Sequence, residues 1–384
     1  MDSLSKKVLL LGASGSIGSQ TIDIINEAKD KFILTAFSVG KRYERAIEIL
    51  KLFNTVKHVY VINEEHAKEI KAQFPNVKVY FGDRGLAKLT KKADYDMCVD
   101  ALVGFSGMEP AVIALKKNKI LCLANKEALV TGGTIINTLL HNKKGKLFPI
   151  DSEHVALAKC LSRCKPEDVK QLIITASGGA LRNIPINELE NVKAQRALQH
   201  PTWRMGNKIT IDCATMMNKG FEIIEAYYLY GYPLDKIKVL MHDESLVHSA
   251  VELKDGSFLV DYGKPDMHNP IRWAMYEGNI DYEILKVNSL DDLKDCHYHE
   301  YDPNRYPCTE LAKEALEGGV AKLVALNAAN EVLVNKYLQD KIKFTDIAKY
   351  LKEVIDIVPG TNFMSLALIK FLDKYVRKET EHVG

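Results

Sequence analysis

The stretch KVLLLGASGSIGSQTIDIINEA (7–28) decides the fold of the N-terminal part of the chain. Its first five residues form a continuous apolar run, which is typical of a buried strand in a parallel sheet. A glycine-rich loop and an amphipathic helical pattern follow. This order favours a dinucleotide site, because the helix N-terminus offers free N–H groups and a positive dipole end to a pyrophosphate. The predicted contacts are Gly12, Ala13, Ser14, Gly15, Ser16, Ile17 and Gly18, and the alternative is a glycine turn in another kind of α/β domain.

The end of the next predicted strand indicates which dinucleotide binds. An NAD site places an Asp or Glu about 20 residues after the glycine loop, where it binds the ribose 2′-hydroxyl. Here the chain reads FSVGKRYER (37–45), with no acid at the strand end. Gly40 is followed by Lys41 and Arg42, and two cations suit a 2′-phosphate. The sequence therefore favours NADPH over NADH, although the same residues also fit a solvated basic loop.

Alternating strand and helix patterns continue up to residue 150. Strands separated by helical stretches predict a parallel, doubly wound sheet. We therefore predict an α/β fold that begins with a Rossmann-like NADPH-binding domain over residues 1–150. The short apolar runs that we interpret as its further strands are 33–39, 56–62, 77–81, 96–102, 119–124 and 143–150.

The pattern changes after residue 150, and a length of 384 residues also favours more than one domain. The segments 171–181 and 208–214 read as strands, and the segments 238–253 and 257–263 alternate like antiparallel strands. Helix-forming residues dominate from Leu311 onward. We predict a central α+β catalytic and dimerisation domain (151–276), a linker (277–310) and a C-terminal helical domain (311–384).

Charge and composition exclude several classes of protein. A formal net charge of +2 gives no support for a nucleic-acid or membrane surface. The seven cysteines are scattered without a C-x-x-C pair, which indicates reduced thiols in a cytoplasmic protein. The N-terminus MDSLSKKVLLLG lacks the pattern of a signal peptide, and no apolar run approaches the roughly 18 residues of a membrane span.

Two carboxylates follow the last predicted strand of the N-terminal sheet, where ligands of doubly wound sheets collect. Asp151 and Glu153 are separated by one residue, so in an extended segment their side chains share a side. Adjacent carboxylates need a cation, and oxygen ligands suit Mg²⁺ or Mn²⁺. Glu222, beside an apolar helical stripe, is the candidate third ligand, and Glu225 is expected to be a solvated or structural carboxylate. A solvated acidic turn is the alternative.

Several polar residues outside the predicted strands are candidates for binding a phosphate group. Ser177 begins a Ser-Gly-Gly loop, whose N–H groups can form an anion nest at the end of a strand. Asn218 and Lys219 stand in a predicted turn before a helix, near its positive dipole end. His200 and Trp203 lie in an aperiodic loop, where Trp203 is either a lid over a substrate or a residue of the core.

Several motifs together are similar to those of one enzyme family. In chain order they are GASGSIG, LANKEALVTGG, PIDSEHVAL, TASGGA, HPTWRMG, DCATMMNKG, YGKPDMHNPI and ALNAANE. They resemble 1-deoxy-D-xylulose 5-phosphate reductoisomerase, across nearly the whole chain. The resemblance implies an NADP-dependent oxidoreductase and isomerase that forms 2-C-methyl-D-erythritol 4-phosphate in non-mevalonate isoprenoid biosynthesis, with NADPH and Mg²⁺, Mn²⁺ or Co²⁺. It also implies a homodimer whose subunits end in a C-terminal helical bundle.

The resemblance assigns roles residue by residue. It implies four catalytic residues, which are Lys126, Asp151, Glu153 and Glu222. The three carboxylates among them are the implied metal ligands. The implied substrate contacts are Lys126, Ser152, Glu153, Ser177, His200, Trp203, Cys213, Asn218, Lys219 and Glu222. We also predict that Gly40, Asn125, Glu127 and Gly206 contact the cofactor. His154 and His248 match histidines thought to assist activity in the family.

The sequence departs from the family at the predicted phosphate pocket. Cys213 stands where the family usually has Ser, and a thiol is a weaker donor. Ala180 and Leu181 stand where the family has Pro and Phe, which predicts a less rigid loop. Two rival interpretations are a homoserine or aspartate-semialdehyde dehydrogenase and an NADP-sensing regulator, and neither explains three carboxylates together with Lys126.

Overall fold

The computed structural model describes residues 5–279 and 294–383, and the chain divides into two compact units. The first unit comprises Met1–Ala128, Ile135–Asp151 and Met267–Lys286. The second comprises Leu129–Thr134, Ser152–Asp266 and Val287–Gly384. The linker predicted over residues 277–310 lies partly outside the described residues. The domain boundaries drawn from the sequence stay predictions.

The first unit is built on a seven-stranded sheet in which all neighbouring strands run parallel. The strand order is β4-β3-β2-β1-β5-β6-β7. Each strand lies within an apolar run read from the sequence, except that β1 and β2 begin one residue earlier, which confirms the doubly wound α/β prediction. The strands are β1 (Lys6–Leu11), β2 (Phe32–Ser38), β3 (His58–Tyr60), β4 (Lys78–Tyr80), β5 (Met97–Asp100), β6 (Ile120–Leu123) and β7 (Lys146–Pro149).

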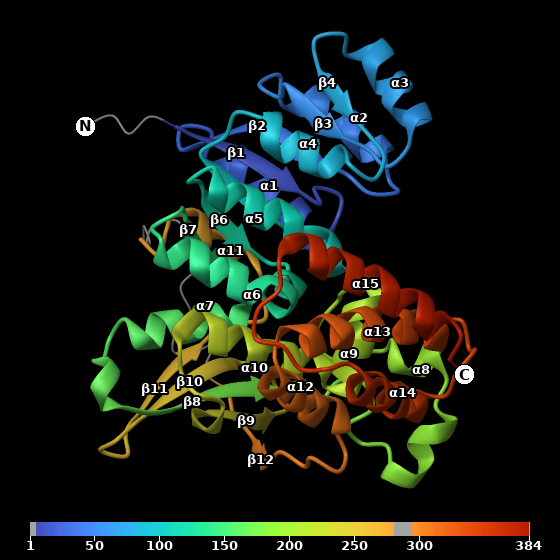
Figure 1. The fold of residues 1–384 in the computed structure, drawn as a ribbon. Helices are drawn as coiled ribbons and strands as arrows, with labels where there is room; N and C mark the ends of the chain where they lie inside the picture. The colour runs from blue at the N-terminus through green and yellow to red at the C-terminus, as the bar shows by residue number, and fades with distance from the viewer. Residues whose placement is uncertain (1–4, 280–293, 384) are drawn as a thin grey trace. The chain divides into compact units, whose positions relative to one another are not determined.

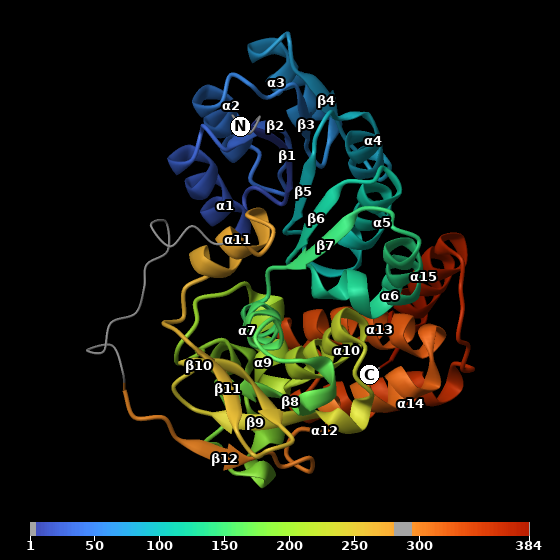
Figure 2. The same cartoon turned by 90° about the vertical axis from the view of Figure 1, so that its left-hand side faces the viewer.

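Helices cover both faces of this sheet, with α1, α2 and α11 on one side and α4 and α5 on the other (Figure 2). The helices are α1 (Ser16–Glu27), α2 (Glu44–Leu52), α3 (Glu64–Gln73), α4 (Gly85–Lys92), α5 (Met108–Lys116) and α11 (His268–Met275), and α6 (Lys126–His141) follows β6. Although α11 is distant in sequence, Ile271, Ala274 and Met275 are fully buried in the same core as β1. The core of this unit is therefore completed by a late segment of the chain.

The order of the strands reverses between β1 and β5, and ligands of such sheets bind at this switch point. The glycine loop follows β1, and Ala101 follows β5 directly. These two loops meet, because a Cβ built on Gly12 would lie 2.4 Å from the carbonyl oxygen of Ala101. The sheet topology therefore places the glycine loop where a dinucleotide is expected.

The second unit contains a five-stranded mixed sheet of order β11-β10-β8-β9-β12. The strands are β8 (Val169–Ala176), β9 (Ile237–His242), β10 (Val247–Leu253), β11 (Phe258–Tyr262) and β12 (Tyr298–Glu300). β8 and β9 are parallel, and the other pairs are antiparallel. β9 and β10 follow one another in sequence but are not neighbours, because β8 lies between them.

The helices of the second unit include α12 to α15, which the figure draws packed together in orange and red (Figure 1). The helices are α7 (Ser152–Leu161), α8 (Ala194–Ala197), α9 (Asn207–Thr215), α10 (Met217–Tyr230), α12 (Pro307–Gly318), α13 (Val320–Leu338), α14 (Phe344–Ile357) and α15 (Leu366–Glu381). Short 3-10 helices of this unit are η2 (Pro166–Asp168), η3 (Ile186–Asn191) and η4 (Leu234–Lys236), whereas η1 (Gly104–Gly107) lies in the first unit. The helical C-terminal part is confirmed.

Two local predictions are wrong. The segment 208–214, read as a strand, lies in helix α9. Its alternating Ile and Thr residues favour a strand, but the helix buries Ile211 and Ala214 together and pairs Lys208 with Asp212 one turn later. Asn218 and Lys219 lie in the first turn of α10 and not in a turn before it, because the helix already begins at Met217, after the left-handed residue Met216. Among the described residues, no helix is long and apolar enough to cross a membrane.

Candidate active site

The glycine loop after β1 is shaped for close approach of a ligand to the backbone. Gly12 has a φ of +82°, which L side chains rarely adopt. A Cβ at Gly18 would lie 2.2 Å from the carbonyl oxygen of Gly12, so the first turn of α1 packs directly on the loop. Ser38 at the end of β2 holds the loop, accepting from the N–H of Gly12 at 2.9 Å. The N-cap residue of α1, Gly15, makes no side-chain capping hydrogen bond, so no side chain of this residue competes with a ligand for the first N–H groups of the helix.

The basic residues predicted to select NADPH follow β2. The loop after β2 leaves the same carboxyl edge of the sheet as the glycine loop after β1, because the two strands are parallel. Lys41 and Arg42 are both exposed, and a Cβ at Gly40 would meet no atom within 4 Å. Gly40 therefore borders open space next to two cations. This arrangement fits a phosphorylated ribose, because the charges are accessible and the backbone beside them does not obstruct approach.

Lys126 begins helix α6 at the carboxyl end of β6 and is buried there. Asn125 caps the helix by accepting from the N–H of Ala128 at 2.8 Å, and its amide donates to the carbonyl oxygens of Leu102 and Gly104. The Asn125 amide also donates to the buried Glu127 at 3.2 Å. Asn125 thus ties the loop after β5 to the helix that carries Lys126.

Three carboxylates, from the start of α7 and from α10, come close together. Asp151 is one peptide bond from Ser152, and Glu153 lies in the first turn of α7 rather than in the extended segment that the sequence suggested. One oxygen each of Asp151, Glu153 and Glu222 lies within 4.8 Å of the others. Ser152 donates to Glu153 at 2.6 Å and fixes its orientation. An all-oxygen set of this kind fits Mg²⁺ or Mn²⁺.

Buried lysines and an amide contact these carboxylates directly. Lys126 lies 3.0 Å from Asp151, and Lys219 lies 2.9 Å from Glu153 and also pairs with Glu222. Asn218 donates to Glu222 at 2.5 Å. Burial alone lowers the pKa of Lys219, but the charges of Glu153 and Glu222 outweigh it and raise this pKa above its ordinary value. The ammonium groups therefore balance much of the negative charge in this cluster.

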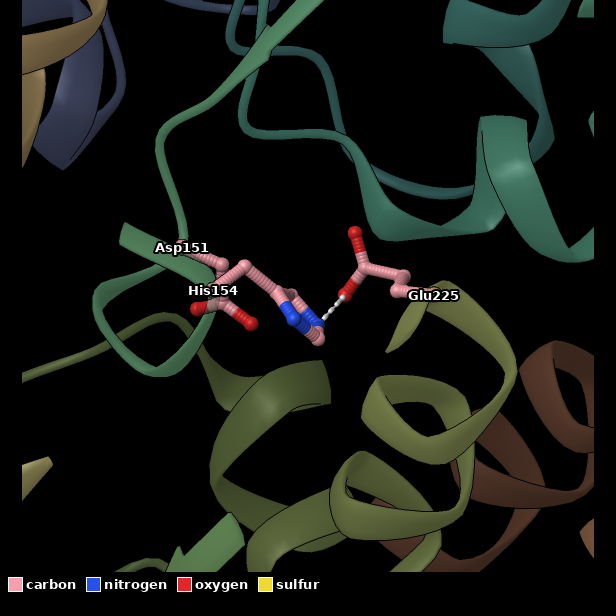
Figure 3. A group of neighbouring side chains, drawn as sticks. All are labelled: Asp151, His154 and Glu225. Carbon is pink, nitrogen blue, oxygen red and sulfur yellow. Dashed lines mark ion pairs between the residues drawn. The ribbon is translucent and has the colours of Figure 1, made fainter. Parts of the chain in front are cut away.

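A second buried pair lies next to the carboxylates (Figure 3). The imidazole of His154 points toward the carboxylate of Glu225, with Nε2 3.2 Å from the nearer oxygen. Both side chains are buried, and Tyr230 donates to the backbone carbonyl of His154. The pair joins α7 to α10, the helices that carry Glu153 and Glu222. Of the two sequence expectations for Glu225, the solvated one is wrong, because Glu225 is buried, and the structural one stays a prediction.

The predicted phosphate residues gather from three segments of the second unit. A Cβ at Gly179, whose φ is +68°, would lie 2.6 Å from the carbonyl oxygen of Cys213, so the Ser-Gly-Gly loop packs on the end of α9. Ser177 lies 3.3 Å from Nε2 of His200. His200 accepts two backbone N–H groups at Nδ1, from Thr202 and Trp203. Burial, with the charge of Arg182, lowers the pKa of His200 to about 4.

Two arginines that no sequence motif indicated hold the Ser-Gly-Gly loop, which begins at Ser177. Arg182 donates to the carbonyl oxygens of Ser177 and Asp243, each at 3.1 Å. Arg305 donates to the carbonyl oxygens of Leu181 and Ile184, at 2.5 and 2.7 Å. These bonds restrain the loop in which the chain lacks the family's Pro and Phe. Arg305 is distant in sequence, so no local pattern pointed to it.

The loop between His200 and α9 holds the remaining predicted residues. Trp203 is half-buried, and its ring centroid lies 6.4 Å from that of His248. Burial lowers the pKa of His248, against the opposing charge of Glu153. Gly206 is the N-cap of α9. The lid and core interpretations of Trp203 both stay predictions.

The glycine loop of the parallel sheet fits a dinucleotide, and the carboxylate cluster contacted by Lys126 and Lys219 fits a divalent metal. These two features are those of the class of NADP-dependent oxidoreductases that use a metal ion. Family models agree with this class. The model of 1-deoxy-D-xylulose 5-phosphate reductoisomerase matches residues 8–133. Models of the C-terminal domains of the same reductoisomerase match residues 147–230 and 262–379.

Relatives and solved structures cover nearly the whole chain. The reductoisomerase of Geobacillus sp. (strain WCH70) is 40% identical over 97% of this chain and 98% of its own. The reductoisomerase of Listeria welshimeri is 39% identical over 91% of this chain and 92% of its own. A crystal structure of DOX-P reductoisomerase with NADPH, fosmidomycin and magnesium has a TM-score of 0.91 at 31% identity, covering 98% and 97% of the two chains. The Zymomonas mobilis enzyme with NADPH has a TM-score of 0.89 at 32% identity, covering 98% of both. This chain belongs to the 1-deoxy-D-xylulose 5-phosphate reductoisomerase family.

Proposed function

We propose that this chain converts 1-deoxy-D-xylulose 5-phosphate to 2-C-methyl-D-erythritol 4-phosphate, using NADPH and a divalent metal. The observation that carries the proposal is the cluster of Asp151, Glu153 and Glu222, with Lys126 and Lys219 against it. A dehydrogenase that only transfers hydride has no use for three converging carboxylates. A rearrangement of a sugar phosphate does, because negative charge develops on substrate oxygens.

The donor set fits a hard divalent cation, and we assign Asp151, Glu153 and Glu222 as its ligands. Such an ion, when bound, supplies Lewis-acid stabilisation of substrate oxygens. Ser152 keeps Glu153 oriented, and Lys126 places a positive charge beside Asp151. A substrate oxygen at this point would accept from the Lys126 ammonium, which explains why a lysine is buried at the start of α6.

The phosphate of the substrate is assigned to the pocket that Ser177, the glycine N–H groups, Cys213, Asn218 and Lys219 build. Gly179 supports this, because its contact with Cys213 joins the loop to α9. Lys219 contacts Glu153 and Glu222 in this structure, and a cation at those carboxylates would release its ammonium to the phosphate. Binding energy from a remote phosphate holds the reacting carbons in place.

His200 completes the phosphate side of the proposed site. Both of its nitrogens are engaged, with Nδ1 accepting from Thr202 and Trp203, so it is the Nε2–H that faces Ser177. This tautomer donates to Ser177 and leaves the serine hydroxyl free to donate to a phosphate oxygen. Trp203, in the same loop, is proposed to cover the substrate and exclude water from the hydride path.

The cofactor is assigned to the first unit. Side chains at Gly12 and Gly18 would meet backbone atoms of Ala101 and of the loop itself, so these glycines let α1 pack directly on the loop. The N-terminus of α1 is thereby placed beside the loop, which fits a pyrophosphate. Lys41 and Arg42 are exposed beside Gly40 and would pair with the 2′-phosphate. NADPH, when bound, supplies the hydride. The predicted contacts of Asn125 and Glu127 belong to the same proposal. The contact predicted for Gly206, which is the N-cap of α9 in the second unit, stays a prediction.

Assembly and location are also proposals. The homodimer follows from the family resemblance. None of the seven cysteines, which all lie in the described residues, forms a disulfide, and this supports the proposal of a reducing, cytoplasmic location. The three functional domains are proposed as the sequence suggested them, apart from α11, which belongs to the core of the first unit.

The test of the function is consumption of NADPH by the purified full-length chain, followed by its absorbance. After treatment with EDTA, we expect no consumption with the sugar phosphate alone and rapid consumption when Mn²⁺ is restored. Equal rates with and without metal would contradict the proposal, as would the absence of any reaction with metal, substrate and NADPH together.

A further inference from the structure

The chain breaks between two helices at Met216. Helix α9 ends at Thr215 and α10 begins at Met217, and Met216 between them has φ 60° and ψ 15°. This left-handed conformation is uncommon for a residue with a side chain and costs free energy. Met216 is buried, so solvent does not relieve the strain. The surrounding structure must therefore hold the break in place.

The proposed phosphate residues flank this break. Cys213 lies in the last turn of α9, and Asn218 and Lys219 lie in the first turn of α10. Gly179 packs on the backbone of Cys213 and Ala214, so the position of the Ser-Gly-Gly loop depends on the end of α9. A small change in the angle between the helices would move these groups relative to one another.

Helix α12 holds the break from one side. Thr309 donates its hydroxyl hydrogen to the carbonyl oxygen of Met216 at 2.8 Å, and its side chain is fully buried. The same helix packs tightly on α10, because a Cβ at Gly220 would lie 2.6 Å from the Cβ of Ala312. Thr309 thus ties α12 to the backbone carbonyl of Met216, the left-handed residue at the break.

Helix α13 holds the end of α9. The amide of Asn330 donates to a carboxylate oxygen of Asp212 at 2.8 Å, and both side chains are buried. The other oxygen of Asp212 pairs with Lys208 at 2.8 Å. Asn330 belongs to the motif ALNAANE, which the sequence singled out and which the proposed site does not use. Its bond reaches the residue directly before Cys213.

We propose that Thr309 and Asn330 are positioning residues for the phosphate pocket, through which the C-terminal helices set the angle of the α9–α10 break. Neither side chain is assigned a contact with the substrate. The inference rests on the proposed function for the identity of the ligand, a sugar phosphate. It extends that function by giving the C-terminal helices a role in substrate affinity.

The test uses the full-length enzyme with Mn²⁺ and NADPH. Thr309→Val removes the hydroxyl at nearly constant shape, and Thr309→Ser keeps it. Asn330→Ala removes the buried amide, and Asn335→Ala is its matched control, because Asn335 is an exposed asparagine on the same helix. We expect Thr309→Val and Asn330→Ala each to raise the KM for the sugar phosphate about tenfold, as for loss of one buried hydrogen bond. The KM for NADPH should stay unchanged, and Thr309→Ser and Asn335→Ala should match the wild type.

Inorganic phosphate provides a readout that does not depend on turnover. We expect it to raise the Tm of the wild type and of Thr309→Ser, and to raise that of Thr309→Val and Asn330→Ala much less. An equal phosphate effect in all variants, or equal sugar-phosphate KM values, would overturn the inference even if Thr309→Val is less stable. A wild type that responds to phosphate but never consumes NADPH would overturn the proposed function alone, and the variant comparison would still decide the inference.

Discussion

Replacement of Lys219 by methionine tests whether a buried ammonium balances the carboxylates of the site. Lys219 is 3% exposed and Glu222 is fully buried, and Nζ of Lys219 lies 2.9 Å from Glu153. Methionine keeps most of the apolar stem and removes the charge. Glu153 and Glu222 would then face each other without their shared cation. We expect the metal-free variant to be substantially less stable than the wild type.

The magnitude follows from the distances. The oxygens of the two glutamates lie within 4.8 Å of one another. At that separation, two unit charges repel by about 3 kcal/mol when the effective dielectric constant is about 20. Removing one partner from a buried ion pair typically costs about 3–5 kcal/mol. The free energy of unfolding of Lys219→Met should therefore fall by about 3–5 kcal/mol at neutral pH.

Urea unfolding in EDTA measures this loss. Lys374→Met is the control, because Lys374 is exposed on α15 and its replacement should change the free energy of unfolding by less than about 0.5 kcal/mol. The double variant Lys219→Met, Glu222→Gln should recover much of the stability, since one of the two repelling charges is gone. Mn²⁺ should stabilise Lys219→Met more than the wild type, in which the ion competes with the ammonium. A single variant as stable as the wild type would refute the reasoning.

Three further changes test other parts of the site. Asp151→Asn should lower kcat by about a hundredfold to a thousandfold, with the Kd for NADPH unchanged by fluorescence titration. Replacing Lys41 and Arg42 together by Ala should raise the KM for NADPH about tenfold while the KM for NADH stays constant. His200, with a pKa of about 4 in the fold, binds a proton more readily when unfolded, so stability should fall as pH drops from about 6.5 toward 4. In His200→Gln, the free energy of unfolding should no longer show this loss between pH 6.5 and 4, as measured by urea unfolding at a series of pH values.

The strands of the parallel sheet could be predicted because their signal is local. Each is a short apolar run bounded by a helix or a glycine, and β1 with its loop even indicates the ligand. The segment 208–214 could not be predicted in the same way. Its Ile and Thr residues alternate as in a strand, and only packing against other helices makes it α9. The contribution of α11 to the first core was also hidden, because it depends on a contact between distant parts of the sequence.

The candidate site shows the same limit. Asp151, Glu153 and Glu222 were chosen from spacing and resemblance, and the structure brings their oxygens together. The burial of Glu225 was not visible, because its partner His154 lies on another helix. Contacts between distant segments are set by tertiary packing, and a single sequence carries no local signal for them.

The carbon skeleton of the product distinguishes a rearrangement of the sugar phosphate from its simple reduction. The purified enzyme would be given the sugar phosphate, NADPH and Mn²⁺, and the product would be examined by ¹³C NMR. We predict a branched skeleton, that of 2-C-methyl-D-erythritol 4-phosphate, formed in an amount equal to the NADPH consumed. A straight-chain product of simple reduction would contradict the account, because it would mean that the carboxylate cluster does not serve a rearrangement.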